Sequence, residues 1–458
     1  MISNRKQMLF FITSIAALCG LLFGYDTGII AGAMIFIAKD FSLTTFVHEI
    51  VVGIVLLGAA IGAGFSGRLT DFYGRRRLMM VAAAAFLIGT LISALAPHVF
   101  WIVIGRLIVG FAIGVASYAA PLYISEVAPK DKRGALVIIN TIMVTGGIVV
   151  AYIIAIVLAP YGAWRWMFGL GVIPAVLLGL GVLALPDSPR WLAKHDLMTK
   201  ALCVLQRIRT TAQAEAEMKE IQMNIAQEEK VKWAHLFTPH IRILLILGIG
   251  LAIIQQISGI NTILYYAPVI FQVAGFSSTL AQLLATLGMG VTNFVFTIVA
   301  MVLVDHIGRR RLLLIGLGVT TICMLVTTFA FHQSSQMPFL RWLTVLSLIV
   351  FVAFYAISIG CLFWLIISEI FPLNVRGMAM SICAMANWIA NLIIALTFLS
   401  LLKALGPSGT FLLYAFAGLL SWLFSYFLVP ETKQVSLEQI EANLRLNKPV
   451  REIGQPLK

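Results

Sequence analysis

The chain has 458 residues, of which 60% are hydrophobic and only 11% are charged, and its mean hydropathy is +0.99. A soluble globular protein of this length could not bury so much apolar surface, so much of that surface must face lipid. The net charge of +13 would suggest nucleic-acid binding in a soluble protein, but Lys and Arg also accumulate on the cytoplasmic side of membrane proteins. Their positions along the chain decide between these two interpretations.

Stretches of about 20 mostly apolar residues, the length that crosses a bilayer, recur along the chain with short polar breaks. We therefore predict an all-α membrane protein with twelve transmembrane helices, six in each half. The predicted spans are 9–36, 50–67, 78–97, 100–125, 135–159, 166–185, 243–270, 279–304, 312–332, 342–368, 377–402 and 410–429. Arg5 and Lys6 before the first apolar stretch could indicate a signal peptide, but the stretch is too long and contains Asp26. We expect an uncleaved first span.

The basic residues predict the orientation in the membrane. With both termini in the cytoplasm, 27 of the 32 Lys and Arg fall in cytoplasmic segments and one, Arg106, falls within a span. The other four are expected outside: Lys39, Arg165, Arg341 and Lys403. This asymmetry predicts a multi-pass plasma-membrane protein with two cytoplasmic termini. Residues 186–242 form the only long polar insert, and its charged, proline-free part at 212–230 is predicted to be a cytosolic helix.

Charged motifs repeat in the two halves. Asp71-Phe-Tyr-Gly-Arg-Arg-Arg77 recurs as Asp305-His-Ile-Gly-Arg-Arg-Arg311, and Ser125-Glu126 through Arg133-Gly134 recurs as Ser368-Glu369 through Arg376-Gly377. The nearly constant separation predicts a duplicated six-helix unit, an arrangement that suits a transporter whose halves rock around a central site. The predicted parts are an N-terminal bundle (1–185), a cytosolic helical linker (186–242), a C-terminal bundle (243–429) and a cytosolic tail (430–458).

These motifs resemble those of the sugar porters of the major facilitator superfamily, nearly end to end. The segment from Gly67 to Arg77 looks like the superfamily's loop motif. Further segments resemble sugar-porter signatures: Arg106 with Pro121–Glu126, Pro186–Arg190, Gln255–Asn261 and Pro430–Lys433. Residues 161–166, 387–391 and 435–440 are similar to bacterial galactose and arabinose proton symporters. The resemblance implies proton-coupled symport of a monosaccharide, a hexose or pentose such as galactose, glucose, arabinose or xylose, in a bacterial inner membrane.

Asp26 lies near the middle of the first span, where a bare carboxylate is costly. Arg106 is the only other charge well inside a span, and both are predicted at similar height in the outer half of the membrane. Burial favours a neutral Asp26 and Arg106 favours the carboxylate, so a small change in packing could switch its protonation. In the porters that the chain resembles, this aspartate carries the coupled proton and this arginine is its partner. The alternative is a static buried ion pair.

Amide side chains surround a predicted break in the seventh span. Gln255, Gln256 and Asn261 flank Ser258-Gly259, where the helix can unwind and expose backbone groups to a cavity. An amide both donates and accepts hydrogen bonds, which matches the hydroxyls of a sugar. The resemblance implies a substrate-binding set of Gln255, Gln256, Asn261, Asn293, Trp364, Asn387 and Trp388. The alternative is that the amides join helices and the tryptophans fill space.

The fifth span departs from the family pattern, because relatives often place glutamine there facing the sugar. Here Asn140 aligns with that position and Gly147 lies two turns further on, so we expect Asn140 to bind substrate in an altered pocket. Tyr265 and Tyr266, toward the outer end of the seventh span, are interpreted either as a gate or as interface anchors.

The repeated charged motifs form a separate class of candidate residues. We predict that they latch helix ends in the outward-facing state, because Arg forks match carboxylates and such contacts can break when the inner gate opens. The residues are Asp71, Arg75, Glu126 and Arg133 in the first half, and Asp305, Arg309, Glu369 and Arg376 in the second. Charge placed for topology alone would explain the arginines but not their repeated acidic partners.

Other functions are disfavoured by missing motifs. The sequence contains no HExxH, Walker loop, GxSxG elbow or cluster of His and Cys, so we predict neither an enzyme nor an ATP-driven pump, and no metal or cofactor. The expected partners are a monosaccharide, a proton and membrane lipid, with no nucleic acid, and the expected state is a monomer. A facilitative uniporter of the same fold is the main alternative, which Asp26 beside Arg106 disfavours. A sugar sensor is a third possibility, but sensors tend to carry longer tails.

Overall fold

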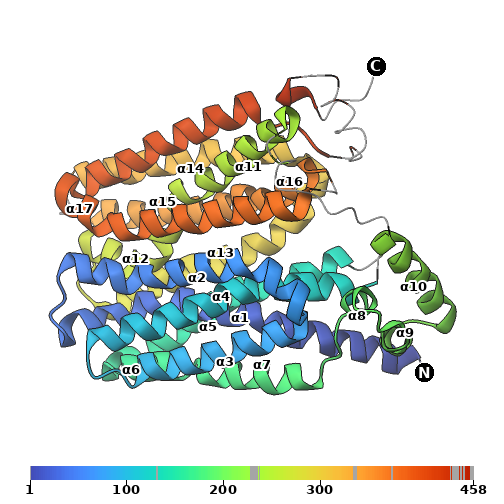
Figure 1. The fold of residues 1–458 in the computed structure, drawn as a ribbon. Helices are drawn as coiled ribbons and strands as arrows, with labels where there is room; N and C mark the ends of the chain where they lie inside the picture. Colours follow the sequence, from blue (N-terminus) through green and yellow to red (C-terminus); the bar gives the residue numbers. More distant parts are fainter. Residues whose placement is uncertain are drawn as a thin grey trace. The chain divides into compact units, whose positions relative to one another are not determined.

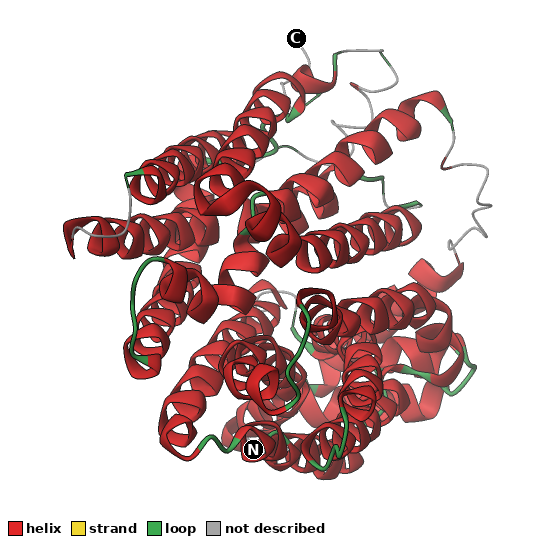
Figure 2. Ribbon diagram, turned by 90° about the vertical axis from the view of Figure 1, so that its left-hand side faces the viewer, coloured by secondary structure: helices red, strands yellow, loops and turns green. Residues whose placement is uncertain are grey.

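The computed structural model describes residues 2–129, 133–226, 238–333, 338–372 and 375–433, with residues 236, 435, 443, 446 and 449–453 besides. All the regular structure in these ranges is helical, as Figures 1 and 2 show. The predicted all-α fold is therefore confirmed.

The first half of the chain supplies six membrane-crossing segments. They are α1 (Ile2–Asp40), α2 (Thr45–Tyr73), α3 (Arg75–Ala94), α4 (Val99–Val127), α5 (Arg133–Leu158), and α6 (Trp164–Gly169) with α7 (Val172–Ala184). A short 3-10 turn, η1 (Ala159–Tyr161), follows α5. Most of these helices begin a few residues before the predicted spans because the polar flank continues the helix, whereas α3 ends at Ala94, three residues before its predicted end.

The second half supplies six more segments. They are α11 (Pro239–Ile257) with α12 (Ile260–Val273), α13 (Thr279–Ile307), α14 (Arg309–His332), α15 (Pro338–Tyr355) with η3 (Ala356–Gly360) and α16 (Cys361–Ile370), and the two parts of α17 (Arg376–Leu428). The 53-residue helix α17 is interrupted at Gly406, which has a φ of 70° and is followed by Pro407. The break separates the eleventh and twelfth predicted spans, so the twelve-helix prediction is confirmed.

The described residues of the polar insert contain three short helices, α8 (Pro189–Lys194), α9 (Met198–Ile208) and α10 (Thr211–Ala226) (Figure 1). The hydroxyl of Ser188 accepts a hydrogen bond from the backbone N–H of Trp191 and so caps α8. The three helices share a hydrophobic cluster that includes Trp191, Leu205 and Met218. The predicted helix at 212–230 is present to Ala226, and its remainder lies outside the described residues.

The chain divides into two compact units. The first comprises Met1–Ile29, Ile54–Ala151 and Ala163–Lys230, and the second comprises Ile30–Gly53, Tyr152–Gly162 and Val231–Lys458. Two pieces of the first half of the sequence, residues 30–53 and 152–162, thus belong to the same unit as the whole second half. These pieces contain the end of α1, the start of α2 and the end of α5.

Glycines allow α1 and α5 to approach closely. Gly20, Gly24 and Gly28 are spaced four residues apart, so they lie on one face of α1. A Cβ atom on Gly24 would overlap the backbone carbonyl of Val144 on α5, and a Cβ on Gly20 would meet the carbonyl of Asn140. Small residues at such positions let two backbones pack in lipid, where apolar burial alone does not drive helix association.

We predict that Gly24→Ala destabilises the protein while Gly64→Ala does not. The added methyl at position 24 must push α5 away, which costs about 2 kcal/mol, whereas a Cβ at Gly64 on α2 meets no atom within 4 Å. The measurement is the midpoint of thermal unfolding of the purified protein in detergent. Equal midpoints for the two variants would contradict this account of the α1–α5 contact.

Candidate functional site

Asp26 and Arg106 form a buried ion pair within the first unit. Nη1 of Arg106, on α4, lies 3.2 Å from Oδ1 of Asp26, on α1, and their side chains are only 1% and 10% exposed. The guanidinium carbon of Arg106 also lies 6.0 Å from the ring centroid of Phe168 on α6. Two residues 80 positions apart are thus brought into contact as the sequence predicted. The pairing offsets the cost of burying either charge.

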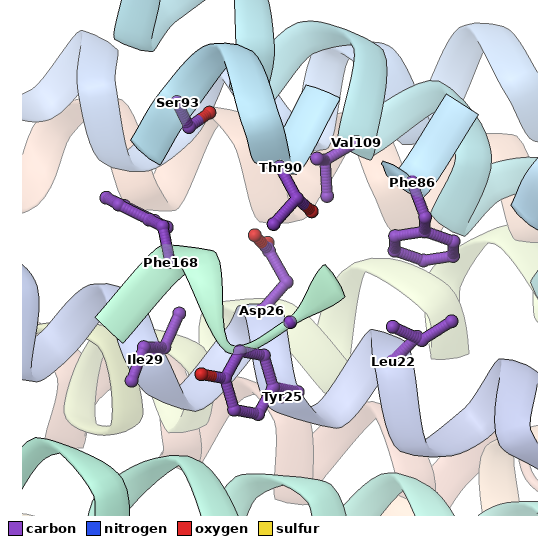
Figure 3. Close-up of a pocket in the computed structure, with 10 residues that line it drawn as sticks. Leu22, Tyr25, Asp26, Ile29, Phe86, Thr90, Ser93, Val109 and Phe168 are labelled. Carbon is purple, nitrogen blue, oxygen red and sulfur yellow. The ribbon is translucent and has the colours of Figure 1, made fainter. Parts of the chain in front are cut away.

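A small pocket opens beside the Asp26 carboxylate. It is lined by α1, α3, α4 and the α6–α7 segment, and includes Tyr25, Phe86, Thr90 and Ser93. Figure 3 shows the carboxylate of Asp26 pointing toward Thr90 on α3. The Tyr25 hydroxyl donates to the backbone carbonyl of Met167, which fixes its ring at the rim of the pocket. The pocket gives the carboxylate a neighbourhood of mixed polarity, because one wall is apolar and another carries hydroxyls.

The amides of the second unit form a continuous hydrogen-bond chain. Nδ2 of Asn261 donates to Oε1 of Gln256 at 2.6 Å, and Nε2 of Gln256 donates to Oδ1 of Asn387 at 3.0 Å. Nδ2 of Asn387 in turn donates to Oε1 of Gln255 at 2.6 Å and to the carbonyl of Ala252 at 3.1 Å. The structure therefore brings four of the predicted residues together, from α11, α12 and α17.

Two interruptions in the helices frame this amide chain. Gly259, with φ 89°, separates α11 from α12 at the predicted break, and only glycine adopts this conformation easily. The second interruption is η3, a π-helical segment in which Ser358 has non-helical dihedral angles. Nε2 of Gln255 donates to the carbonyls of Ile359 and Gly360 there, at 3.2 Å each. Sequence analysis missed this segment, although Ser358 and Gly360 inside an apolar span were a signal of it.

The other predicted substrate residues lie in three different settings. Asn293, on α13, and Trp388, on α17, are buried. Trp364, on α16, is 43% exposed, and its ring contacts that of Phe363. Asn140, on α5, belongs to the first unit, and its side-chain oxygen is buried without a hydrogen-bond partner. These four residues are not part of the hydrogen-bond chain described above.

Gly147 has a packing reason for lacking a side chain. A Cβ atom there would overlap the backbone carbonyl of Leu21 and approach the backbone of Tyr25 on α1. A glutamine at this position would therefore force α1 and α5 apart next to Asp26. Gly147 is therefore part of the close α1–α5 contact.

The two tyrosines of α12 are both anchored to α17. The Tyr266 hydroxyl donates to the backbone carbonyl of Ala395 at 2.9 Å, and its ring packs 5.1 Å from that of Phe398. The Tyr265 hydroxyl accepts a hydrogen bond from Nδ2 of Asn391 at 3.5 Å. Both tyrosines are buried, and they therefore hold α12 against α17 in this structure.

The charged motif of the first half forms a compact cluster. Arg75, which begins α3, lies 2.8 Å from Glu126 at the end of α4 and 3.7 Å from Asp71 at the end of α2. Nη1 of Arg75 also donates to the carbonyl of Thr70 at 3.2 Å. Gly74 makes the turn before α3 with φ 86°. One arginine thus joins the ends of three helices.

The second half repeats this cluster in detail. Arg309 pairs with Glu369 at 3.0 Å and donates to the carbonyl of Val304 at 3.2 Å, five residues back, just as Arg75 does to Thr70. Gly308 has φ 97°, the counterpart of Gly74. Glu431 adds a carboxylate that accepts from the backbone N–H groups of Arg309 and Arg310. The agreement of side-chain contacts, and not just of sequence letters, supports a duplicated unit.

The other three predicted latch residues are Arg133, Asp305 and Arg376. The side chains of Arg133 and Asp305 lie outside the described residues. Arg376, at the start of α17, donates to the carbonyl of Phe371 at 3.2 Å, and its Nη2 is buried without a hydrogen-bond partner. Of the predicted pairs, the structure therefore brings together Arg75 with Asp71 and Glu126, and Arg309 with Glu369.

Comparison with known proteins gives consistent matches over nearly the whole chain. A protein family described as "Sugar (and other) transporter" matches residues 12–444. The galactose-proton symporter of Escherichia coli K12 is 43% identical over 98% of this chain and 97% of its own length. The arabinose-proton symporter of the same strain is 39% identical over 98% and 96%. One similar solved structure is that of the major facilitator superfamily proton:xylose symporter XylE bound to 6-bromo-6-deoxy-D-glucose. It is 32% identical to this chain, the match covers 96% of this chain and 99% of the XylE chain, and the TM-score is 0.80.

Proposed function

The chain belongs to the sugar (and other) transporter family, and from this membership we propose that it is a proton-coupled symporter of a monosaccharide that works by alternating access. It is a multi-pass membrane protein with the twelve-helix fold of the major facilitator superfamily. Relatives named galactose- and arabinose-proton symporters match it along almost their full length, which supports this substrate class. The observation that carries the coupling proposal is the buried pair of Asp26 and Arg106.

In this proposal Asp26 carries the proton and Arg106 is its partner. With the proton absent, the carboxylate is held by the guanidinium at 3.2 Å. With the proton present, the neutral acid no longer needs that contact, and the pocket beside it offers hydroxyl groups on α3. The two protonation states therefore favour different local packing of α1 against α4. Such a difference is what a ligand or proton needs in order to bias a conformational equilibrium.

The sugar site is proposed at the amide chain of the second unit, with Gln255, Gln256, Asn261 and Asn387 at its centre. The amides are already fixed by one another, so little ordering is required when a sugar binds. Asn293, Trp364, Trp388 and Asn140 are proposed as further contacts. The tryptophans would stack on the apolar face of a sugar ring and the asparagines would hydrogen-bond to its hydroxyls.

We place the transporter in a bacterial inner membrane as a monomer surrounded by lipid, with both termini in the cytoplasm. The moving halves are the bundles at 1–185 and 243–429. The arginine clusters at Arg75 and Arg309 act as latches on the inner side, and Tyr265 with Tyr266 act as an outer gate. The ion pairs of Arg75 with Glu126, at 2.8 Å, and of Arg309 with Glu369, at 3.0 Å, support the latch. Arginines that served only to set the topology would not need carboxylate partners.

For the sugar site, we predict that Gln256→Ala or Asn261→Ala strongly weakens sugar binding while the protein remains folded. Each substitution removes one hydrogen-bonding side chain and leaves the next amide in the chain without its partner. The loss should be about 1–3 kcal/mol, or roughly 5-fold to 150-fold in affinity. The measurement is sugar binding to the purified variants, with thermal unfolding as the control for folding. Unchanged affinity would exclude these positions from the site.

For the inner latch, we predict that Glu126→Gln or Arg309→Gln changes the balance of inward-facing and outward-facing states and leaves intrinsic sugar affinity unchanged. Glu126→Gln weakens the contact with Arg75. The shift should be modest for each residue because several charges share the task. State populations can be measured by spin-label distances on the inner side. Identical populations in the variants and the unsubstituted protein would defeat the latch.

For proton coupling, we predict that Asp26→Asn abolishes accumulation of sugar against a gradient but preserves sugar exchange between the two sides. The amide mimics the protonated acid and cannot release a proton. A pH difference of one unit supplies about 1.4 kcal/mol, and this energy is usable only if proton and sugar move together. The measurements are uptake with an acid-outside gradient and counterflow without one. A variant that still concentrates sugar would show that Asp26 is structural and that the carrier lies elsewhere.

A further inference from the structure

Glu49 is a buried carboxylate that the transport mechanism above does not use. It lies in the first turns of α2 and is 1% exposed. Its Oε1 accepts a hydrogen bond from the backbone N–H of Ser400 at 2.7 Å, and its Oε2 accepts one from the hydroxyl of Ser400, also at 2.7 Å. Both oxygens are thus satisfied by a single residue of α17. Hydrogen bonds to a charged acceptor are about twice as strong as those between neutral groups.

The contact joins a helix of the first half to a helix of the second half within one compact unit. Residues 30–53 belong to the same unit as Val231–Lys458. Two neighbouring contacts also join the start of α2 to the second half of the chain, one to α12 and one to α17. The ring of His48 lies 5.7 Å from that of Tyr266, and a Cβ added to Gly53 would meet the side chain of Leu396. Glu49 therefore lies in a packed seam between the start of α2 and the part of α17 that precedes the Gly406 break.

The position of this seam follows from the proposed topology. The loop between α1 and α2 lies on the outer side of the membrane, and Ser400 lies one to two turns before Gly406, near the outer end of its span. In alternating access, helices of the two halves separate on the outer side whenever the sugar site opens outward. The two hydrogen bonds of Glu49 must then break, and outside water must take their place.

We propose that Glu49 is an outer latch that holds the starting turns of α2 against α17 through Ser400 and releases them each time the transporter opens outward. This rests on the proposed alternating-access function and on its topology. The latch is distinct from the arginine clusters, because its donor is an uncharged residue. Its chemistry explains the use of a carboxylate: two acceptor oxygens bind the N–H and the hydroxyl of one residue at once. A glutamine offers one acceptor oxygen and turns an amide N–H toward the second donor.

The test measures opening of the seam directly, in the full-length protein in lipid nanodiscs. Spin labels are placed at Phe46→Cys on α2 and Leu405→Cys on α17, both of which are exposed in the structure, after the exposed Cys203 is changed to Ser. Distance distributions are recorded by pulsed electron paramagnetic resonance, with singly labelled proteins as background controls. The compared backgrounds are the unsubstituted protein, Glu49→Gln, Ser400→Ala and Thr397→Ala.

Glu49→Gln should raise the ratio of separated to closed populations about tenfold. Ser400→Ala should raise this ratio less, because the hydrogen bond from the backbone N–H of residue 400 to Glu49 remains. Thr397→Ala is the matched control. Its hydroxyl bonds to the carbonyl of Ile393 in its own helix, one turn from Ser400, so the ratio should stay the same. If Glu49→Gln fails to fold, Ser400→Ala still tests the latch.

Unchanged populations in both Glu49→Gln and Ser400→Ala would overturn the latch, as would an equal shift in Thr397→Ala. These distances are measured without sugar or a pH gradient, so they do not depend on proton coupling. Sugar uptake without proton uptake in the unsubstituted protein would instead refute the proposed symport while leaving the latch result standing.

Discussion

The ion pair of Asp26 and Arg106 places two full charges between helices that are otherwise apolar, and the surrounding structure is arranged to keep both satisfied. No water is present in lipid to solvate an unpaired charge, so a charged side chain within the spans is stabilised by a partner inside the protein. The close approach of α1 to α5 at Gly24 and Gly147 fixes the helix that carries Asp26. Asp26 therefore faces groups on α3, α4 and the α6–α7 segment, which line its pocket.

Interruptions of the helices occur where polar groups must be exposed to one another. Gly259 breaks the seventh span beside Gln255 and Gln256, and the π-helical segment η3 presents backbone carbonyls to Gln255. Irregular backbone at membrane depth is tolerated where protein, rather than lipid, supplies its hydrogen bonds. The same breaks give the helices points at which they can bend. In the proposed mechanism, binding and movement therefore use the same short stretches of chain.

Much of this architecture could be predicted from the sequence, because it depends on local patterns. Apolar stretches of membrane-crossing length gave the twelve spans, and the isolation of Asp26 and Arg106 among apolar residues indicated their pairing. The position of Gly259 indicated the break in the seventh span. These features can be recognised from runs of neighbouring residues, or from isolated charges whose burial would be costly without a partner.

Other features depend on how distant helices approach one another. The sequence did not indicate that Gln255 would bond to Ile359 and Gly360, that Ser400 would hold Glu49, or that Trp364 would remain 43% exposed. Each depends on side-chain positions that are set by tertiary packing. A serine or glutamate at a helix end carries no local sign of its partner, so such contacts become visible only once the helices are placed.

Simultaneous recording of the sugar flux and the proton flux decides whether the two substrates cross the membrane together. Unsubstituted protein is reconstituted into vesicles in a weakly buffered medium, with the same pH inside and outside, and labelled galactose, glucose, arabinose and xylose are added in turn. For the transported sugar, the medium should become more alkaline as sugar enters, with the two rates in a fixed ratio at every sugar concentration. Sugar entry with no change in the pH of the medium would rule out proton symport.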